Sequence, residues 1–168
     1  MEGKAPAFVA PYQPVSLDIK VAKVRGDASQ LEKLVREAVT KRLERDGIEV
    51  KAGQSTVVRA IVSEEAGAQL PIFERQSPFD FRGRDTGRKA TEAHGAAVVE
   101  IVATGETQPL WRDTLKATSS RLYIDQQITD ETTRQNMLDQ LARQLNQLDV
   151  PYFIPKAREL VALPAIVY

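Results

Sequence analysis

The segment GAAVVEIVATGETQPLWRDTLKA, residues 95–117, constrains the fold of this chain more than any other. Apolar residues occupy every second position before the turn GETQP, and the period of two resumes after it at Trp111, Leu115 and Ala117. This pattern predicts two antiparallel strands joined by a short connection. Trp111 is the chain's only tryptophan and is in phase with the buried positions, so we expect its ring to lie in the core and not at a ligand site.

An amphipathic helix is predicted over residues 27–47. Apolar side chains recur there at helical spacing and form a single stripe. Either Asp27 or Ser29 can cap the first turn, since each is followed three residues later by a Gln or Glu. Gly47 ends the helix, because glycine adopts the left-handed conformation at little cost.

Strand patterns flank this helix on both sides. Residues 15–24 alternate apolar and polar side chains, residues 48–50 predict a short strand, and residues 55–65 predict a longer one. The apolar residues of 55–65 fall on both faces, which indicates a central position in a sheet. Two strands joined through a helix are expected to run parallel, with a right-handed crossover.

A second helix is predicted over residues 129–149, with Thr129 or Asp130 as its cap. Its apolar stripe consists of Leu138, Leu141, Leu145 and Leu148. The simplest packing of all these elements is α+β. It is a two-layer sandwich in which a mixed sheet of about four to five strands carries both helices on one face.

The remaining segments lack a clear period. Residues 66–93 contain prolines, glycines and many charges, which predicts a long inserted loop before the last hairpin. We expect the sandwich domain to span 15–148, with 1–14 as an extended leader or linker and 149–168 as an extended strap.

The composition excludes several chemistries. The chain has no cysteine, so thiolate catalysis and cysteine-ligated metal centres are absent. One histidine, His94, cannot alone form a metal site or a catalytic triad, and no cofactor is expected. Lys and Arg number 23, as do Asp and Glu, so no global positive field favours nucleic acid. No run approaches the roughly 20 apolar residues that span a bilayer.

The candidate contact surface lies within residues 71–89, where aromatic and basic side chains are interleaved. Protein interfaces and single-stranded nucleic acids both use this combination. The residues that we expect to bind a partner are Phe73, Arg75, Phe79, Phe81, Arg82, Arg84 and Arg88.

The same segment also carries acidic residues. Paired carboxylates such as Asp80 and Asp85 could serve acid–base chemistry in a hydrolase. Here they alternate with arginines, which favours a loop whose charges pair with one another.

Two short motifs and the order of the elements carry a family resemblance. A strand, a helix ending in RLERDGIEV, a terminal amphipathic helix and the motif PLWRDTL at 109–115 together resemble small domains of the bacterial envelope. Examples are the lipopolysaccharide-assembly lipoprotein, the amino-terminal domain of the Tol–Pal propeller protein and a group of uncharacterised lipoproteins. The resemblance covers roughly residues 15–148.

The resemblance implies assembly and binding work without catalysis, and it favours an exported location. Two features depart from it, namely the missing lipid-anchor cysteine and the Phe/Arg-rich segment 71–89. The first residues also lack the apolar core of a signal peptide. The sequence therefore predicts a non-enzymatic interaction or assembly module with a protein partner. Nucleic-acid binding through 71–89 and a hydrolase using the carboxylates remain as alternatives.

Overall fold

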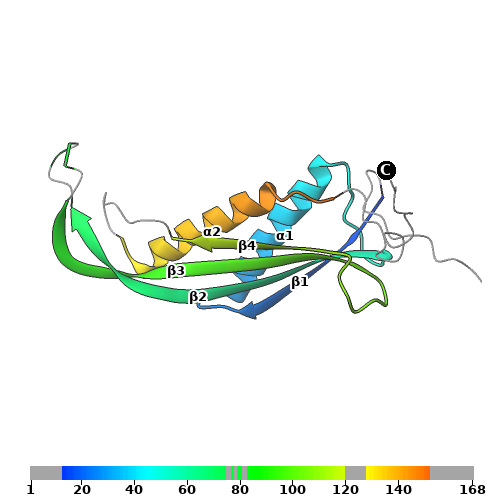
Figure 1. Cartoon of the computed structure of the whole chain (residues 1–168), viewed down its shortest axis with the longest axis horizontal. Coiled ribbons are helices and arrows are strands. Elements are labelled where there is room, and N and C mark those ends of the chain that lie inside the picture. Colours follow the sequence, from blue (N-terminus) through cyan, green and yellow to red (C-terminus); the bar gives the residue numbers. More distant parts are fainter. Residues whose placement is uncertain (1–12, 75–76, 78, 81–82, 120–127, 152–168) are drawn as a thin grey trace, which may run out of the picture.

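Four strands and two helices make up the part of the chain that the computed structural model describes, residues 13–74, 77, 79–80, 83–119 and 128–151. In chain order they are β1 (Ser16–Lys23), α1 (Ala28–Arg45), β2 (Thr56–Glu74), β3 (Arg84–Ala103), β4 (Trp111–Thr118) and α2 (Asp130–Asn146). The sheet order is β1-β2-β3-β4, with β1 parallel to β2 and the other neighbours antiparallel. Both helices lie on one face of the sheet (Figure 1), so the predicted α+β sandwich is confirmed.

The core lies between the sheet and the helices. Residues that pair across strands share a face; Val58 pairs with Ile101, and Ala60 pairs with Val99. These residues are buried together with the stripes of both helices, among them Leu31, Leu43, Met137, Leu138, Leu141 and Leu145. Burying each large apolar side chain contributes about 1.5–3 kcal/mol. Trp111 pairs with Ile101 and packs, partly buried, against this core.

Local chemistry sets both ends of α1. Asp27 is the N-cap, and its carboxylate accepts a 2.8 Å hydrogen bond from the backbone N–H of Ser29. After the last turn Gly47 has a φ of 75°, and the N–H of Ile48 donates to the carbonyl of Leu43 at 3.0 Å. This reversal buries Ile48 and sends the chain back toward the sheet.

The strand predicted at 48–50 is wrong. Only Val50 pairs there, in an isolated parallel bridge with Val15. The chain turns at Gly53, where φ is 78°, so the pairing ends before a ladder can extend.

The long loop predicted over 66–93 is also wrong. Strands β2 and β3 continue through it as an antiparallel pair as far as Glu74 and Arg84, with register shifts between Ala66 and Gln69 and between Pro71 and Phe73. Most of this ribbon faces solvent on both sides, so its sequence needs no period of two. We call residues 66–93 the hairpin arm. It curves out past the first turn of α2, at the left of Figure 1.

The predicted leader 1–14 and strap 149–168 lie almost entirely outside the described residues. Where the chain is described after α2, Leu148 and Val150 are buried, and Arg42 Nε donates to the Leu148 carbonyl at 2.6 Å. The end of α2 is thus tied to α1. Neither of the helices described has the length and apolar character needed to cross a membrane.

Candidate functional site

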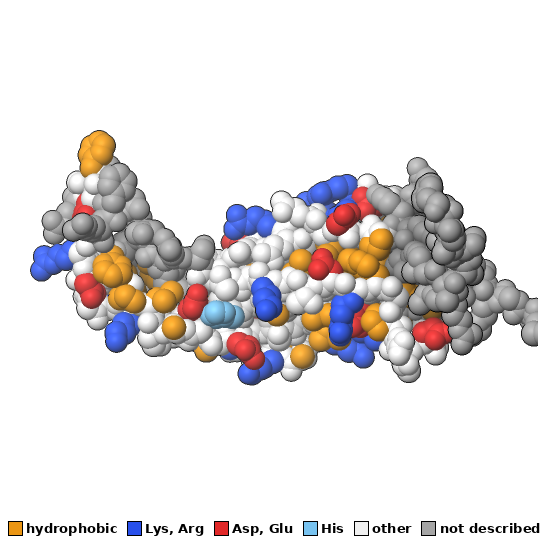
Figure 2. All heavy atoms as spheres, viewed as in Figure 1, with side chains coloured by type: hydrophobic (Ala, Val, Ile, Leu, Met, Phe, Trp, Pro, Cys, Tyr) orange, Lys and Arg blue, Asp and Glu red, His pale blue; other side chains and the backbone are white. Residues whose placement is uncertain are grey.

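Four of the seven residues predicted to bind a partner are described, and they lie on the hairpin arm. Phe79 is 83% exposed and is the one large hydrophobic residue among those described that stands in solvent. Phe73 is half-buried on β2, and Arg84 and Arg88 are exposed on β3. The other three predicted residues, Arg75, Phe81 and Arg82, lie outside the described residues. Figure 2 shows a hydrophobic side chain at the outermost point of the arm.

Acidic side chains at this end hold turns together. Asp80 accepts a 2.9 Å hydrogen bond from the backbone N–H of Gly83, and Asp85 accepts one of 2.8 Å from the N–H of Gly87. Both glycines have positive φ, 65° and 71°. The two carboxylates that the hydrolase alternative requires are therefore each engaged by a separate turn.

The arm has packing of its own. Ile72 and Ala90 are 2% and 1% exposed, although they lie on the two-stranded ribbon. The Thr86 hydroxyl donates to the Ile72 carbonyl at 2.7 Å and so links the two strands. A Cβ at Gly83 would stand 3.0 Å from the Cβ of Phe73, so glycine allows the two strands to approach closely at this point.

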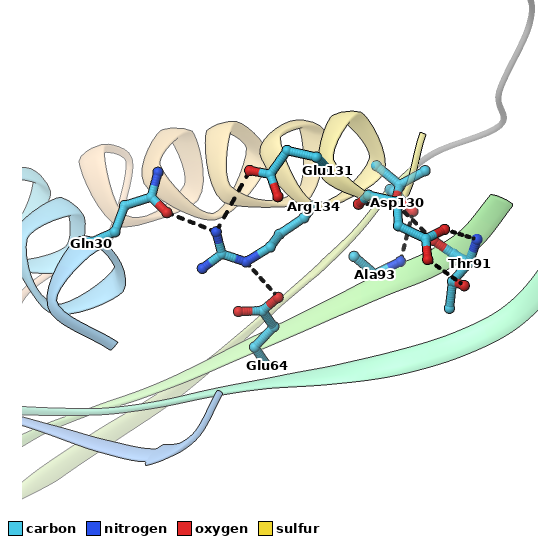
Figure 3. A network of polar contacts seen from close by, with 9 residues as sticks. Gln30, Glu64, Thr91, Ala93, Asp130, Glu131 and Arg134 are labelled. Atoms are coloured by element: carbon cyan, nitrogen blue, oxygen red, sulfur yellow. Dashed lines mark hydrogen bonds and ion pairs between the residues drawn. The ribbon is translucent and has the colours of Figure 1, made fainter. Parts of the chain in front are cut away.

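At the base of the arm, side chains accept hydrogen bonds from backbone N–H groups of β3. Strand β4 ends at Thr118, so on this side of β3 the backbone groups of residues before His94 have no strand neighbour among the described residues. The Ser119 hydroxyl accepts from the N–H of Ala93 at 3.0 Å. The next outward N–H, that of Thr91, donates to Asp130 Oδ1 at 2.7 Å (Figure 3).

Asp130 is the first residue of α2, so this contact joins the helix to the arm. Its Oδ2 accepts from the Thr91 hydroxyl at 3.1 Å, and Thr133 Oγ1 donates to the Thr91 carbonyl at 2.7 Å. The backbone N–H of Thr91, and then its hydroxyl, hold the pKa of the Asp130 carboxyl below its usual range. Thr129 caps the helix by accepting from the N–H of Thr132, as one of the two predicted caps.

A buried ionic cluster lies behind this anchor. Arg134 of α2 donates through Nε to Glu64 of β2 at 2.8 Å and through Nη1 to Gln30 of α1 at 2.7 Å (Figure 3). The guanidinium group packs over Gly26, where a Cβ would come within 2.8 Å of its Cζ. The cluster therefore joins the sheet and both helices next to the arm.

His94 also has a local partner. Its Nε2 lies 2.9 Å from Glu92 Oε2, and both side chains stack beside Gly67, where a Cβ would clash with the ring at 2.2 Å. On the neighbouring strand β2, Glu65 pairs with His94. The Glu65 carboxylate accepts a 3.0 Å hydrogen bond from Lys23 Nζ. The hydrogen bond from Lys23, followed by its charge, lowers the pKa of Glu65. This row marks the place where the arm leaves the sheet.

The other candidate sites among the described residues are a possible metal centre and a surface groove. The described residues contain no group of three or more His, Asp or Glu side chains that could hold a metal ion. A groove of about 430 Å³ lies between the outer surfaces of α1 and α2. Its one acidic residue, Glu37, is 3.9 Å from Lys33.

Known proteins offer architectural neighbours. No family model matches the chain, and no curated protein matches its sequence. One similar solved structure is a neuraminyllactose-binding hemagglutinin homolog from Helicobacter pylori, with 14% identity, 88% of this chain and 92% of that chain covered, and a TM-score of 0.47. Another is a minor lipoprotein from Acinetobacter baumannii, with 14% identity, coverages of 81% and 91%, and a TM-score of 0.45.

A third neighbour is the rare lipoprotein B from Shewanella oneidensis, with 19% identity, coverages of 79% and 86%, and a TM-score of 0.36. Two of the three are named as lipoproteins. At these identities and TM-scores the likeness says nothing about the function of this chain.

Proposed function

We propose that this chain is a non-catalytic interaction module that binds a protein partner through the outer end of its hairpin arm. The observation that carries the proposal is Phe79, which is 83% exposed at the end of a ribbon that projects beyond the sandwich. Aromatic residues are enriched in protein interfaces, where they can serve as anchors. The ribbon is held firmly at its base by Asp130, Thr133 and Ser119.

The charges around Phe79 indicate the chemistry of the partner. Asp80 and Asp85 accept hydrogen bonds from backbone N–H groups, whereas Arg84 and Lys89 are exposed. A partner surface with an apolar pocket rimmed by carboxylates would complement this arrangement. Arg88 has a second role, because its Nη2 donates to the Ile128 carbonyl at 3.4 Å and ties the arm to the segment before α2.

A protein partner is favoured over nucleic acid by the charge of the chain. Its formal net charge is +0, and acidic residues such as Glu74 and Asp85 stand among the exposed cations of the arm. Binding through several phosphate contacts would need a local positive field that these carboxylates weaken. A mobility shift with single-stranded DNA or RNA at low salt, lost steeply as salt rises, would instead support the nucleic-acid alternative.

The hydrolase alternative has less support than either binding function. Asp80 and Asp85 are held by separate turns, and Glu92 is paired with His94. These carboxylates are distributed along the arm and do not surround a common cavity that the described residues form.

Shortening the arm tests the proposed function. Leu70 pairs with Ala90, so replacing residues 71–89 by Asn-Gly would close the ribbon with a two-residue turn and leave the rest of its ladder in place. The intact and shortened chains would each be co-purified from the source cell and weighed by native mass spectrometry. A discrete protein partner lost on shortening is the expected result. A partner retained by the shortened chain, or no partner for either chain, would refute the role of the arm.

A further inference from the structure

The sheet has a second face, opposite the helices, that no described element covers. The sequence did not reveal it, because its residues come from strands far apart in the chain. Their side chains stand at alternate positions, and the registers of the three strand pairs place them in rows across the sheet. In Figure 2 hydrophobic side chains lie among basic and acidic ones along the strands.

The central row is a ladder of alternating charge. Asp18 pairs with Arg59, Arg59 with Glu100, and Glu100 with Arg112, so the row reads negative, positive, negative, positive across all four strands. Arg59 Nε is 3.1 Å from Asp18 Oδ2, and its Nη1 is 3.8 Å from Glu100 Oε2. Arg112 Nη2 is 2.8 Å from Glu100 Oε1. We call these four residues the charge ladder.

Apolar rows flank the charge ladder on both sides. Val57 pairs with Val102 in one row, and Ile61 pairs with Val98 in the other. Val102 is already buried within the chain, at 3% exposed, whereas the other three are half-buried and keep part of their surface in solvent. An apolar surface of this kind at the centre of a sheet favours a covering layer, and sheets stack face to face at about 10 Å.

The order of the four charges indicates which surface could cover this face. Consider a second copy of the chain, related to the first by a 180° rotation about an axis that lies between the two faces and parallel to the strands. Its four charges run in the reverse order, so each faces an opposite charge of the first copy. Asp18 then faces Arg112 of the partner subunit, and Arg59 faces Glu100 of the partner subunit. The same rotation places each apolar row opposite itself. Rotation about an axis along the ladder would instead put like charges opposite each other, which is repulsive.

We propose that two copies of this chain associate through these faces, with a two-fold axis parallel to the strands. The interface has a centre of eight alternating charges between two apolar strips, and each charge gains an opposite charge across the interface. The hairpin arm contributes no residue to this pairing, so the association is independent of its proposed partner. The occupant of the face is thus a second copy of the chain.

Charge reversal at the two ends of the ladder tests this geometry. Asp18→Arg and Arg112→Glu each place a like charge beside Arg59 or Glu100 within the chain, but Asp18 and Arg112 have side-chain exposures of 40% and 59%, so solvent screens these contacts and the fold is expected to tolerate the changes. In the symmetric dimer each variant alone places like charges opposite each other twice. A mixture of the two variants places opposite charges at both contacts and should restore association.

Sedimentation velocity of the full chain over a concentration series is the measurement. The wild type should dimerise, each variant alone should weaken association at least tenfold, and an equimolar mixture should recover a heterodimer. Lys41→Glu, an equal charge change on the exposed surface of α1, should leave association unchanged. Circular dichroism confirms that each variant is folded. A monomeric wild type, variants that still dimerise, or a mixture that stays monomeric would overturn the proposal.

Discussion

Glu64 and Arg134 form an ion pair in the interior, with 0% and 9% of their side chains exposed and 2.8 Å between Arg134 Nε and the carboxylate. The pair lies where β2 leaves the sandwich to enter the arm, and it joins that strand to α2. Gln30 extends the contact to α1. A buried charge without a partner costs several kcal/mol, so removing either residue alone should destabilise the fold.

We expect Glu64→Leu to destabilise the chain by about 3–5 kcal/mol, because Arg134 would keep its charge in the interior with only the exposed Glu131 carboxylate, 3.9 Å from its Nη1, as an ionic partner. The double variant Glu64→Leu with Arg134→Met should recover most of this loss, since both groups become apolar. Urea unfolding followed by the fluorescence of Trp111 gives both free energies. Glu131→Gln is the matched comparison, because it removes the other carboxylate near Arg134, which is 3.9 Å away but 73% exposed, and its loss should cost less than about 1 kcal/mol. A double variant no more stable than Glu64→Leu would contradict this account.

The two side-chain contacts at the base of the arm, Thr91 N–H to Asp130 and Ala93 N–H to Ser119, are expected to act independently. Asp130→Ala should speed hydrogen exchange at the amide of Thr91 and leave that of Ala93 protected, because Ala93 donates to Ser119. Ser119→Ala should have the opposite pattern. Exchange followed by NMR distinguishes the two amides. If either variant exposed both amides equally, the base would act as one unit and the assignment of separate anchors would fail.

The stability contributed by the contact between Asp130 and Thr91 should depend on pH in a known direction. Hydrogen bonds from Thr91 lower the pKa of Asp130 in the folded state, so their contribution to stability is full above the unfolded value of about 3.9 and is lost as pH falls through the lower folded value. The Thr91 amide resonance should therefore stay constant from neutral pH to about pH 4 and shift below it. Thr91→Val removes the hydroxyl donor and should move the Asp130 midpoint upward. A wild-type midpoint above the usual aspartate value would contradict the prediction.

Much of the sandwich could be predicted from the sequence, because its elements bury one side. The stripe that includes Leu138 and Leu141 has helical spacing, and the alternation after residue 95 has the period of a strand with one face in the core. The cap at Asp27 and the positive φ at Gly47 follow from local side-chain and backbone chemistry.

The arm and the charge ladder could not be predicted in the same way. Residues 66–74 and 84–93 pair as strands, yet most of them face solvent on both sides, and no apolar alternation marks them. Asp18, Arg59 and Glu100 become neighbours only through the register of β1, β2 and β3, which depends on the whole sheet. The sequence around any one of these residues does not show which residues of the other strands it pairs with.

The most direct test of the central claim is photo-crosslinking in the source cell from position 79, where Phe79 would be replaced by a photoreactive phenylalanine. The matched control places the same group at Gln108, an exposed residue in the turn between β3 and β4 at the opposite end of the sheet (Figure 1). We predict a discrete protein adduct from position 79 that resists nuclease and is absent from position 108. Equal labelling from both positions, or no protein adduct from position 79, would contradict the claim that the arm is the binding surface.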